Sequence, residues 1–103
     1  ELRMDVYVDK IAGFNVDTDA IHFGIVPPGS SAERNIIVTA GRFRSLVNIE
    51  YSGDIAEWVY VSHNNFVLEP YENKTVIVYV FVPSGAKVPS YREGKIRVTF
   101  RKI

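Results

Sequence analysis

The sequence predicts a single all-β domain, an antiparallel β-sandwich of about seven to eight strands over residues 1–103. Three observations support this prediction. Apolar and polar residues alternate along much of the chain, turn-forming residues interrupt the alternation at short intervals, and a length of 103 residues suits one hydrophobic core. Because a strand points successive side chains to opposite faces, this alternation is typical of strands with one buried face.

The predicted strands follow in order from this pattern. The first runs from Leu2 to Val8 and the last from Lys95 to Arg101. Shorter runs between them predict strands around residues 21–25, 34–39, 47–51, 58–62 and 66–68. Pro, Gly, Asn and Asp residues lie between these runs, where they favour turns.

Three single residues carry further structural expectations. Gly24 should permit a β-bulge or the close approach of another backbone. Gly94 should supply the positive φ of the last hairpin. Trp58 is the natural candidate for a large central core residue, and it ends the only candidate helix, a single turn over residues 54–58.

The longest apolar run, Val76 to Val82, predicts a central strand. If the valines at positions 76, 78 and 80 face the core, the opposite face carries Ile77, Tyr79 and Phe81. Such a face either lies under another element or forms an adhesive patch. We expect it to pack against a neighbouring domain of a larger protein.

A second candidate interface is the loop segment Arg42, Phe43 and Arg44, which mixes cations with an aromatic ring. Arg and aromatic residues are over-represented at interface hot spots. The alternative is an ordinary solvated loop with one residue turned inward.

Composition excludes several functional classes. Twelve Lys and Arg residues balance twelve Asp and Glu residues, which argues against nucleic acid as a partner and against direct membrane contact except through a parent protein. The chain has no cysteine, so it forms no disulfide and has no thiolate chemistry. Gln is absent and Met occurs once, which favours a thermophilic source, although six Asn residues oppose that inference.

No catalytic or cofactor motif is recognisable, and we expect neither an enzyme nor a cofactor. His22 should lie on the face opposite Ile21 and Phe23, as a surface histidine, and His63 in a loop. A triad of Ser62, His63 and Asp54 is rejected, because adjacent strand residues point to opposite faces.

Two polar motifs admit a ligand or a modification. The segment Asp17, Thr18 and Asp19 could offer oxygen atoms to calcium, but we favour an ordinary polar turn with side-chain hydrogen bonds. Asn73, Lys74 and Thr75 form an Asn-x-Thr sequon in a predicted turn. Glycosylation of Asn73 depends on export of the protein.

Two stretches carry a family resemblance. The first is Ile21 to Ser31, with Phe23-Gly24 and Pro28-Gly29-Ser30, and the second joins Phe66 to Pro70 with the strand before Pro83 and with Tyr91 to Ile96. Together they resemble immunoglobulin-like modules of archaeal and bacterial surface proteins. They are also similar to the wider group that includes the major sperm protein domain and pilus chaperones. The resemblance implies an immunoglobulin-like sandwich, and it carries over no binding residue.

These observations predict a non-catalytic interaction or spacer module of a surface-exposed multidomain protein, in the cell envelope or outside the cell. Because the chain begins at Glu1 rather than Met, we expect it to be excised or processed from a longer protein. One alternative is an intracellular scaffold like the major sperm protein domain, located in the cytoplasm and binding peptide partners. Another is an accessory domain of a secreted hydrolase, which would contact carbohydrate through an exposed coplanar set among Trp58, Tyr60, Tyr51 and Tyr71.

Overall fold

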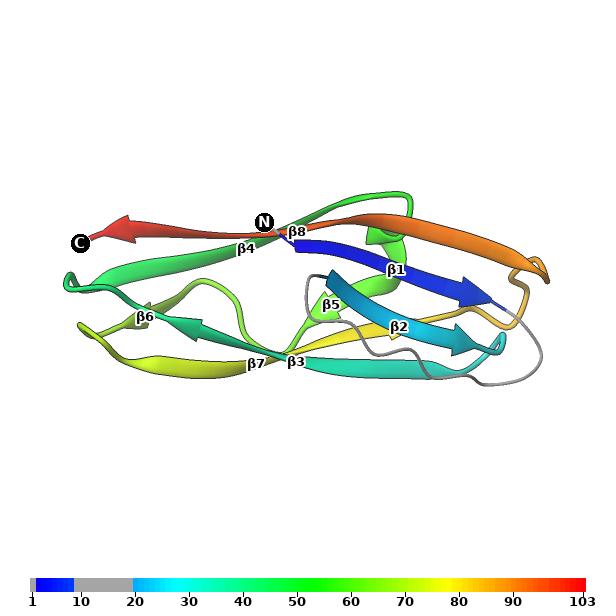
Figure 1. Ribbon diagram of the computed structural model, residues 1–103, viewed down its shortest axis with the longest axis horizontal. Coiled ribbons are helices and arrows are strands. Elements are labelled where there is room, and N and C mark those ends of the chain that lie inside the picture. Colours follow the sequence, from blue (N-terminus) through cyan, green and yellow to red (C-terminus); the bar gives the residue numbers. More distant parts are fainter. Residues whose placement is uncertain (1, 9–19) are drawn as a thin grey trace.

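A computed structural model describes residues 2–8 and 20–103 (Figure 1). The elements in chain order are β1 (Leu2–Val8), β2 (Ala20–Val26), β3 (Ser31–Thr39), β4 (Ser45–Gly53), the 3-10 turn η1 (Ala56–Trp58), β5 (Val59–Val61), β6 (Phe66–Leu68), β7 (Asn73–Phe81) and β8 (Ser90–Lys102). One sheet has the strand order β2-β1-β8-β4-β6, and the other has the order β3-β7-β5. The two sheets face each other in an elongated body of 46 × 23 × 17 Å. The predicted all-β sandwich is confirmed.

One strand pair differs from the predicted antiparallel arrangement. β1 and β2 run parallel, whereas each of the other described pairs is antiparallel. Alternating hydrophobicity has a period of two residues in both kinds of pair, so it carries no information about strand direction. The parallel neighbour therefore could not be found from the pattern.

The glycines in the strands have two different roles. Gly24 has a φ of 76°. Asp5 pairs with His22 and Tyr7 pairs with Ile25, so β2 has one more residue than β1 between these two pairs. This extra residue is the bulge predicted at Gly24.

Gly94 contradicts its predicted role in a hairpin turn. It lies inside the thirteen-residue strand β8, and a Cβ atom there would overlap the carbonyl oxygen of Ser52. Gly94 is therefore required for close backbone approach. The positive φ in this region, 95°, belongs to Gly53 on the neighbouring strand β4.

The core lies between the two sheets and is built mainly from short aliphatic side chains. Val76, Val78 and Val80 are fully buried, as the alternation of β7 predicts. Among the residues whose burial the structure describes, the largest fully buried side chain is that of Phe23 on β2. Trp58 packs against this core while remaining partly exposed, so its predicted central position is wrong. Trp58 is the last residue of the helical turn η1, and one face of its indole ring is covered by Arg92 and not by the core.

Candidate functional site

The outer face of β3, β7 and β5 carries the largest group of predicted interface residues. Ile77, Tyr79 and Phe81 share this face of β7, opposite the buried valines, as the sequence predicts. Phe81 is 48% exposed, and Ile77 and Tyr79 are partly exposed.

Two residues on neighbouring strands extend this face, and the sequence did not predict that they belong to it. Tyr60 of β5 pairs directly with Tyr79, and Ile37 of β3 pairs with Thr75, diagonally next to Ile77. Tyr60 is 51% exposed and Ile37 is 71% exposed. Strand pairing across the sheet was the missing information, because the two residues lie far from β7 in the sequence. We call Ile37, Tyr60, Ile77, Tyr79 and Phe81 the outer apolar face.

Two features make the outer apolar face suitable for contact with another protein. The rings of Tyr60 and Tyr79 stack with centroids 4.7 Å apart and planes at 15°, which holds both side chains in place. Glu33 is the single charged residue among the outward positions of the described strands β3, β5 and β7. The cores of protein interfaces are likewise depleted of charge and enriched in aromatic residues.

The structure separates the second predicted interface from the first. The loop of Arg42, Phe43 and Arg44 follows β3 at the end where Thr39 pairs with Asn73, whereas Phe81 ends β7 at its other end. Phe43 is 42% exposed and lies between two cations, with the Arg42 guanidinium 4.9 Å and the Lys102 ammonium 4.1 Å from its ring centroid. Arg44 donates to Glu69 at 3.0 Å. The loop is therefore exposed and basic, in contrast with the outer apolar face.

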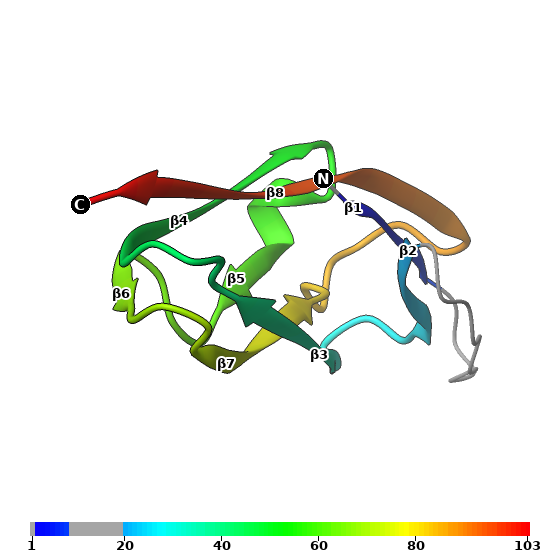
Figure 2. The ribbon, with the colours of Figure 1, turned by 60° about the vertical axis from the view of Figure 1, so that its left-hand side comes forward.

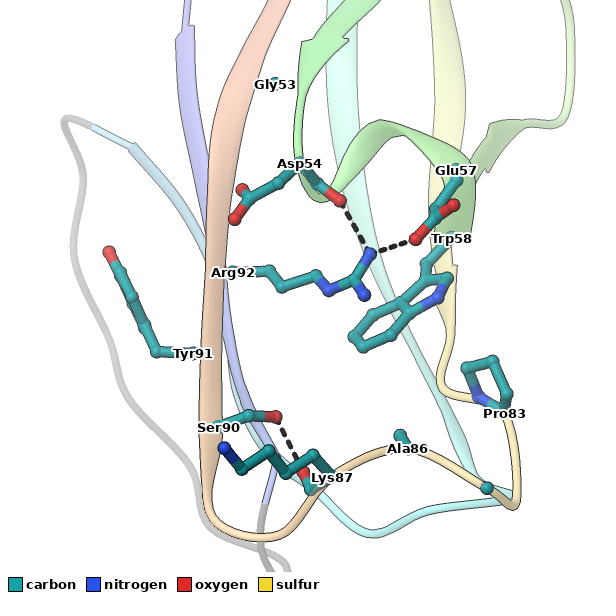
Figure 3. Close-up of a pocket in the computed structure, with 11 residues that line it drawn as sticks. Gly53, Asp54, Glu57, Trp58, Pro83, Ala86, Lys87, Ser90, Tyr91 and Arg92 are labelled. Carbon is teal, nitrogen blue, oxygen red and sulfur yellow. Dashed lines mark hydrogen bonds and ion pairs between the residues drawn. The ribbon is translucent and has the colours of Figure 1, made fainter.

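A pocket of about 1120 Å³ lies where β4 leads into η1, beside the segment that enters β8 (Figure 3). Arg92 crosses this pocket. Its guanidinium lies 3.8 Å from the centroid of the Trp58 ring, donates to the carbonyl oxygen of Asp54 at 2.9 Å and forms an ion pair with Glu57. Because the guanidinium is bound to protein groups on η1 and on the segment before it, Arg92 fixes η1 to β8.

The four aromatic residues considered for carbohydrate binding do not share one surface. Trp58 is covered by Arg92, and Tyr51 is partly buried against the core. Tyr71 lies in the turn before β7 and is 73% exposed, while Tyr60 stacks on Tyr79. A sugar ring stacks on an open, flat aromatic surface, and this arrangement does not provide one among the described residues.

The two histidines have different surroundings. His63 is exposed, as predicted, but its Nδ1 atom lies 2.9 Å from Oγ of Ser62. The predicted opposite orientation of these neighbours is wrong because β5 ends at Val61, before both residues. The side chain of Asp54 accepts a hydrogen bond from the backbone N–H of Glu93 at 2.9 Å and is therefore bound to β8.

His22 is the larger correction. It lies on the face opposite Ile21 and Phe23, but its side chain is only 14% exposed because it contacts the buried carboxylate of Asp5. Arg3 donates to the same carboxylate at 3.2 Å and to the Tyr91 hydroxyl at 2.9 Å. A polar network thus covers the outer side of β1, β2 and β8. No single-strand pattern could find it, since its members come from three strands.

The remaining predictions concern glycosylation, metal binding and the membrane. Asn73 is exposed as the first residue of β7, and Thr75 is also exposed. Asp17, Thr18 and Asp19 lie outside the described residues. Residues 2–8 and 20–103 contain no group of three or more acidic or histidine side chains placed to hold a metal ion. Within the same ranges, no helix has the length and apolar character needed to cross a bilayer.

Comparisons of the chain with protein-family models, with curated proteins and with solved structures gave no match. The function must therefore be inferred from the surfaces described above.

Proposed function

We propose that this domain is a non-catalytic interaction or spacer module of a surface-exposed multidomain protein, and that its outer apolar face packs against a neighbouring domain. The observation that supports this proposal is the contiguous exposure of Tyr60, Phe81 and Ile37 around the partly exposed Ile77 and Tyr79. Exposed apolar patches on otherwise ordinary surfaces mark protein contacts.

The surroundings of the face favour a protein over the two alternative ligands. A scaffold that binds acidic peptides would need cations on its binding face, but Glu33 is the charged residue among the described outward positions. A carbohydrate would need an open ring surface, whereas Tyr60 and Tyr79 cover each other by stacking. A second protein surface requires only matching shape and apolar area.

Hydroxyl-radical footprinting tests the proposal without any substitution. The isolated 103-residue chain is compared with the parent protein purified from native cells. Tyr60, Tyr79 and Phe81 should be oxidised more slowly in the parent protein, while Tyr71, in an exposed turn, serves as the internal control. Equal oxidation of Tyr79 and Phe81 in both samples would contradict packing through this face.

The location is tested separately. An immunoblot of fractionated cells should show the domain in the envelope fraction, in a band much larger than this chain alone. A cytosolic band of the size of the chain would contradict the surface-protein proposal. Mass spectrometry of the same material should report whether Asn73 carries a glycan, which export would allow.

A further inference from the structure

The pocket beside η1 lies between two segments that hydrogen bonds hold in place. Figure 2 shows η1 in green and the connection from β7 to β8 in orange on the same side of β8. In that connection, the N–H of Ala86 donates to the carbonyl oxygen of Pro83 at 3.1 Å. The hydroxyl of Ser90 donates to the carbonyl oxygen of Lys87 at 2.7 Å. Because Arg92 holds η1 on the other wall, the pocket is formed before a ligand arrives, as binding sites usually are.

The guanidinium of Arg92 uses one of its nitrogens for its polar contacts with the protein. Nη1 makes both the hydrogen bond to the carbonyl oxygen of Asp54 and the ion pair with Glu57, and both dashed lines in Figure 3 end on this atom. The contact with Trp58, at 3.8 Å from Cζ to the ring centroid, requires no N–H group. Within the described structure, Nε and Nη2 therefore remain without a hydrogen bond or an ion pair.

This unused edge of the guanidinium has a defined chemical preference. In an arginine side chain, Nη1 lies on the same side as Cδ, so the N–H of Nε points the same way as one N–H of Nη2. Two parallel donors match the two oxygens of a carboxylate, or two oxygens of a phosphate, in a bidentate pair. Figure 3 shows these two nitrogens on the side of the Arg92 guanidinium away from its contacts with Asp54 and Glu57.

Other groups in the same pocket suit an anion that carries an apolar group. Lys87 is exposed, and its ammonium forms no ion pair with any described residue. The indole N–H of Trp58 likewise donates to no described residue. Pro83 and Ala86 add apolar surface to the lining. A ligand bound to the guanidinium edge therefore finds both a second cation and apolar contacts within the pocket.

The charges of the lining favour a single negative charge on the ligand. Asp54 and Glu57 line the same pocket as Lys87 and Arg92, so the formal charges of these four side chains cancel. A phosphate monoester carries about −1.5 to −2 charges at pH 7, and the two carboxylates would repel it more strongly than they repel a monoanion. A carboxylate, which has one charge and two coplanar oxygens, fits both the edge and the charge balance.

We propose that this pocket binds a singly charged carboxylate joined to an apolar group, and that the Nε–Nη2 edge of Arg92 holds the carboxylate. Two sources offer this chemistry, a small organic acid and the C-terminal residue of a peptide. Lys87 adds electrostatic attraction, and Trp58 and Pro83 contact the apolar group. The lining residues named above are not part of the outer apolar face, so this proposal and the proposed function can fail independently.

An NMR titration of the ¹⁵N-labelled 103-residue chain tests the proposal. The probe is N-acetylphenylalanine. It should shift the Nε–H signal of Arg92 and the indole N–H signal of Trp58 in a saturable way, with a Kd of about 1 mM, as expected for a ligand of this size. The uncharged amide of the same compound should bind about tenfold more weakly or less. Phenyl phosphate should also bind more weakly than N-acetylphenylalanine.

Two further probes distinguish the sources of the carboxylate. Phenylacetate has the carboxylate and the ring without a peptide group, and N-acetyl-alanyl-phenylalanine extends the probe by one residue. Equal affinity for these two compounds would assign the pocket to a small organic acid. Affinity that is about threefold or more higher for the longer compound would assign it to the end of a peptide chain.

Variants test the role of the guanidinium edge. Arg92→Lys keeps the positive charge but removes the parallel donors, and it should weaken the binding of N-acetylphenylalanine about tenfold or more, as followed by the Trp58 indole signal. Arg101→Lys, at an exposed position on the same strand, is the matched control and should leave the affinity unchanged. Glu57→Gln should strengthen binding, because it removes a negative charge and the ion pair with Nη1. If Arg92→Lys alters the amide spectrum of β7, Glu57→Gln becomes the deciding variant.

Four results would overturn the proposal. The first is the absence of a saturable shift at Arg92 and Trp58 up to about 50 mM N-acetylphenylalanine. The second is equal affinity for the acid and its amide, which would show that the carboxylate is not recognised. The third is tighter binding of phenyl phosphate. The fourth is unchanged affinity in a folded Arg92→Lys variant or weaker binding in Glu57→Gln.

Discussion

The Nδ1 atom of His22 lies 2.8 Å from Oδ1 and 3.0 Å from Oδ2 of Asp5, across the parallel pair of strands β1 and β2. Asp5 is 4% exposed, and the guanidinium of Arg3 also contacts its carboxylate. A buried carboxylate is stable only when partners replace its lost hydration. The imidazole therefore joins the edge strand β2 to the sheet through a group that would otherwise be costly to bury.

Removing the imidazole should destabilise the domain. We expect His22→Ala to lower the free energy of unfolding by about 2 to 3 kcal/mol, because the buried carboxylate of Asp5 would lose one of the two side chains that contact it in the described structure. Urea unfolding followed by circular dichroism measures the change. His63→Ala is the matched control at an exposed position and should change stability by less than about 0.5 kcal/mol. Equal losses in the two variants would contradict a structural role for the contact.

The hydroxyl of Tyr91 should titrate late. Burial raises the pKa of Tyr91; the hydrogen bond from Arg3 opposes this, and the hydrogen bond to Glu93 adds to it. Above about pH 10, the folded protein therefore keeps a proton that the unfolded chain has lost, and stability falls as the pH rises through this window. Tyr91→Phe should remove that part of the alkaline loss and delete the latest tyrosine step in an absorbance titration. Tyr71→Phe, in an exposed turn, is the matched control and should leave the late step of Tyr91 in place.

Gly94 should tolerate no side chain. A Cβ atom would overlap the carbonyl oxygen of Ser52 and lie 2.8 Å from the side chain of Ile55, so β4 and β8 would have to separate. We expect Gly94→Ala to cost about 2 to 4 kcal/mol in thermal or urea unfolding. Gly41→Ala is the control, because a Cβ atom at that position would have no other atom within 4 Å, and it should be neutral or slightly stabilising. A neutral Gly94→Ala would show that the strands can separate at little cost.

The sequence predicted those features that depend on a single strand. The alternation of β7 correctly placed Val78 in the core and Tyr79 on the outer face. It could not predict that Tyr60 stacks on Tyr79, because that contact depends on which strands are neighbours. The Asp5–His22 contact was missed for the same reason.

The different exposure of residues along β8 was also beyond a sequence reading. Phe100 continues the regular alternation of Ile96 and Val98, which predicts burial for all three side chains. Phe100 is nevertheless 47% exposed, whereas Ile96, which pairs with Leu2 of β1, is 1% exposed. Periodicity describes a strand but not its neighbours.

Arg92 should control the environment of the single tryptophan. Its guanidinium covers the Trp58 ring at 3.8 Å and forms an ion pair with Glu57 (Figure 3). We expect Arg92→Ala to shift Trp58 fluorescence to longer wavelength, because water would replace the guanidinium over the indole, and to lower stability by about 1 kcal/mol. Arg101→Ala, which removes an exposed arginine from the same strand, should leave the spectrum unchanged. An unchanged spectrum in Arg92→Ala would mean that the cation does not shield the ring in solution, and the pocket beside η1 would then be open to ligands that stack on Trp58.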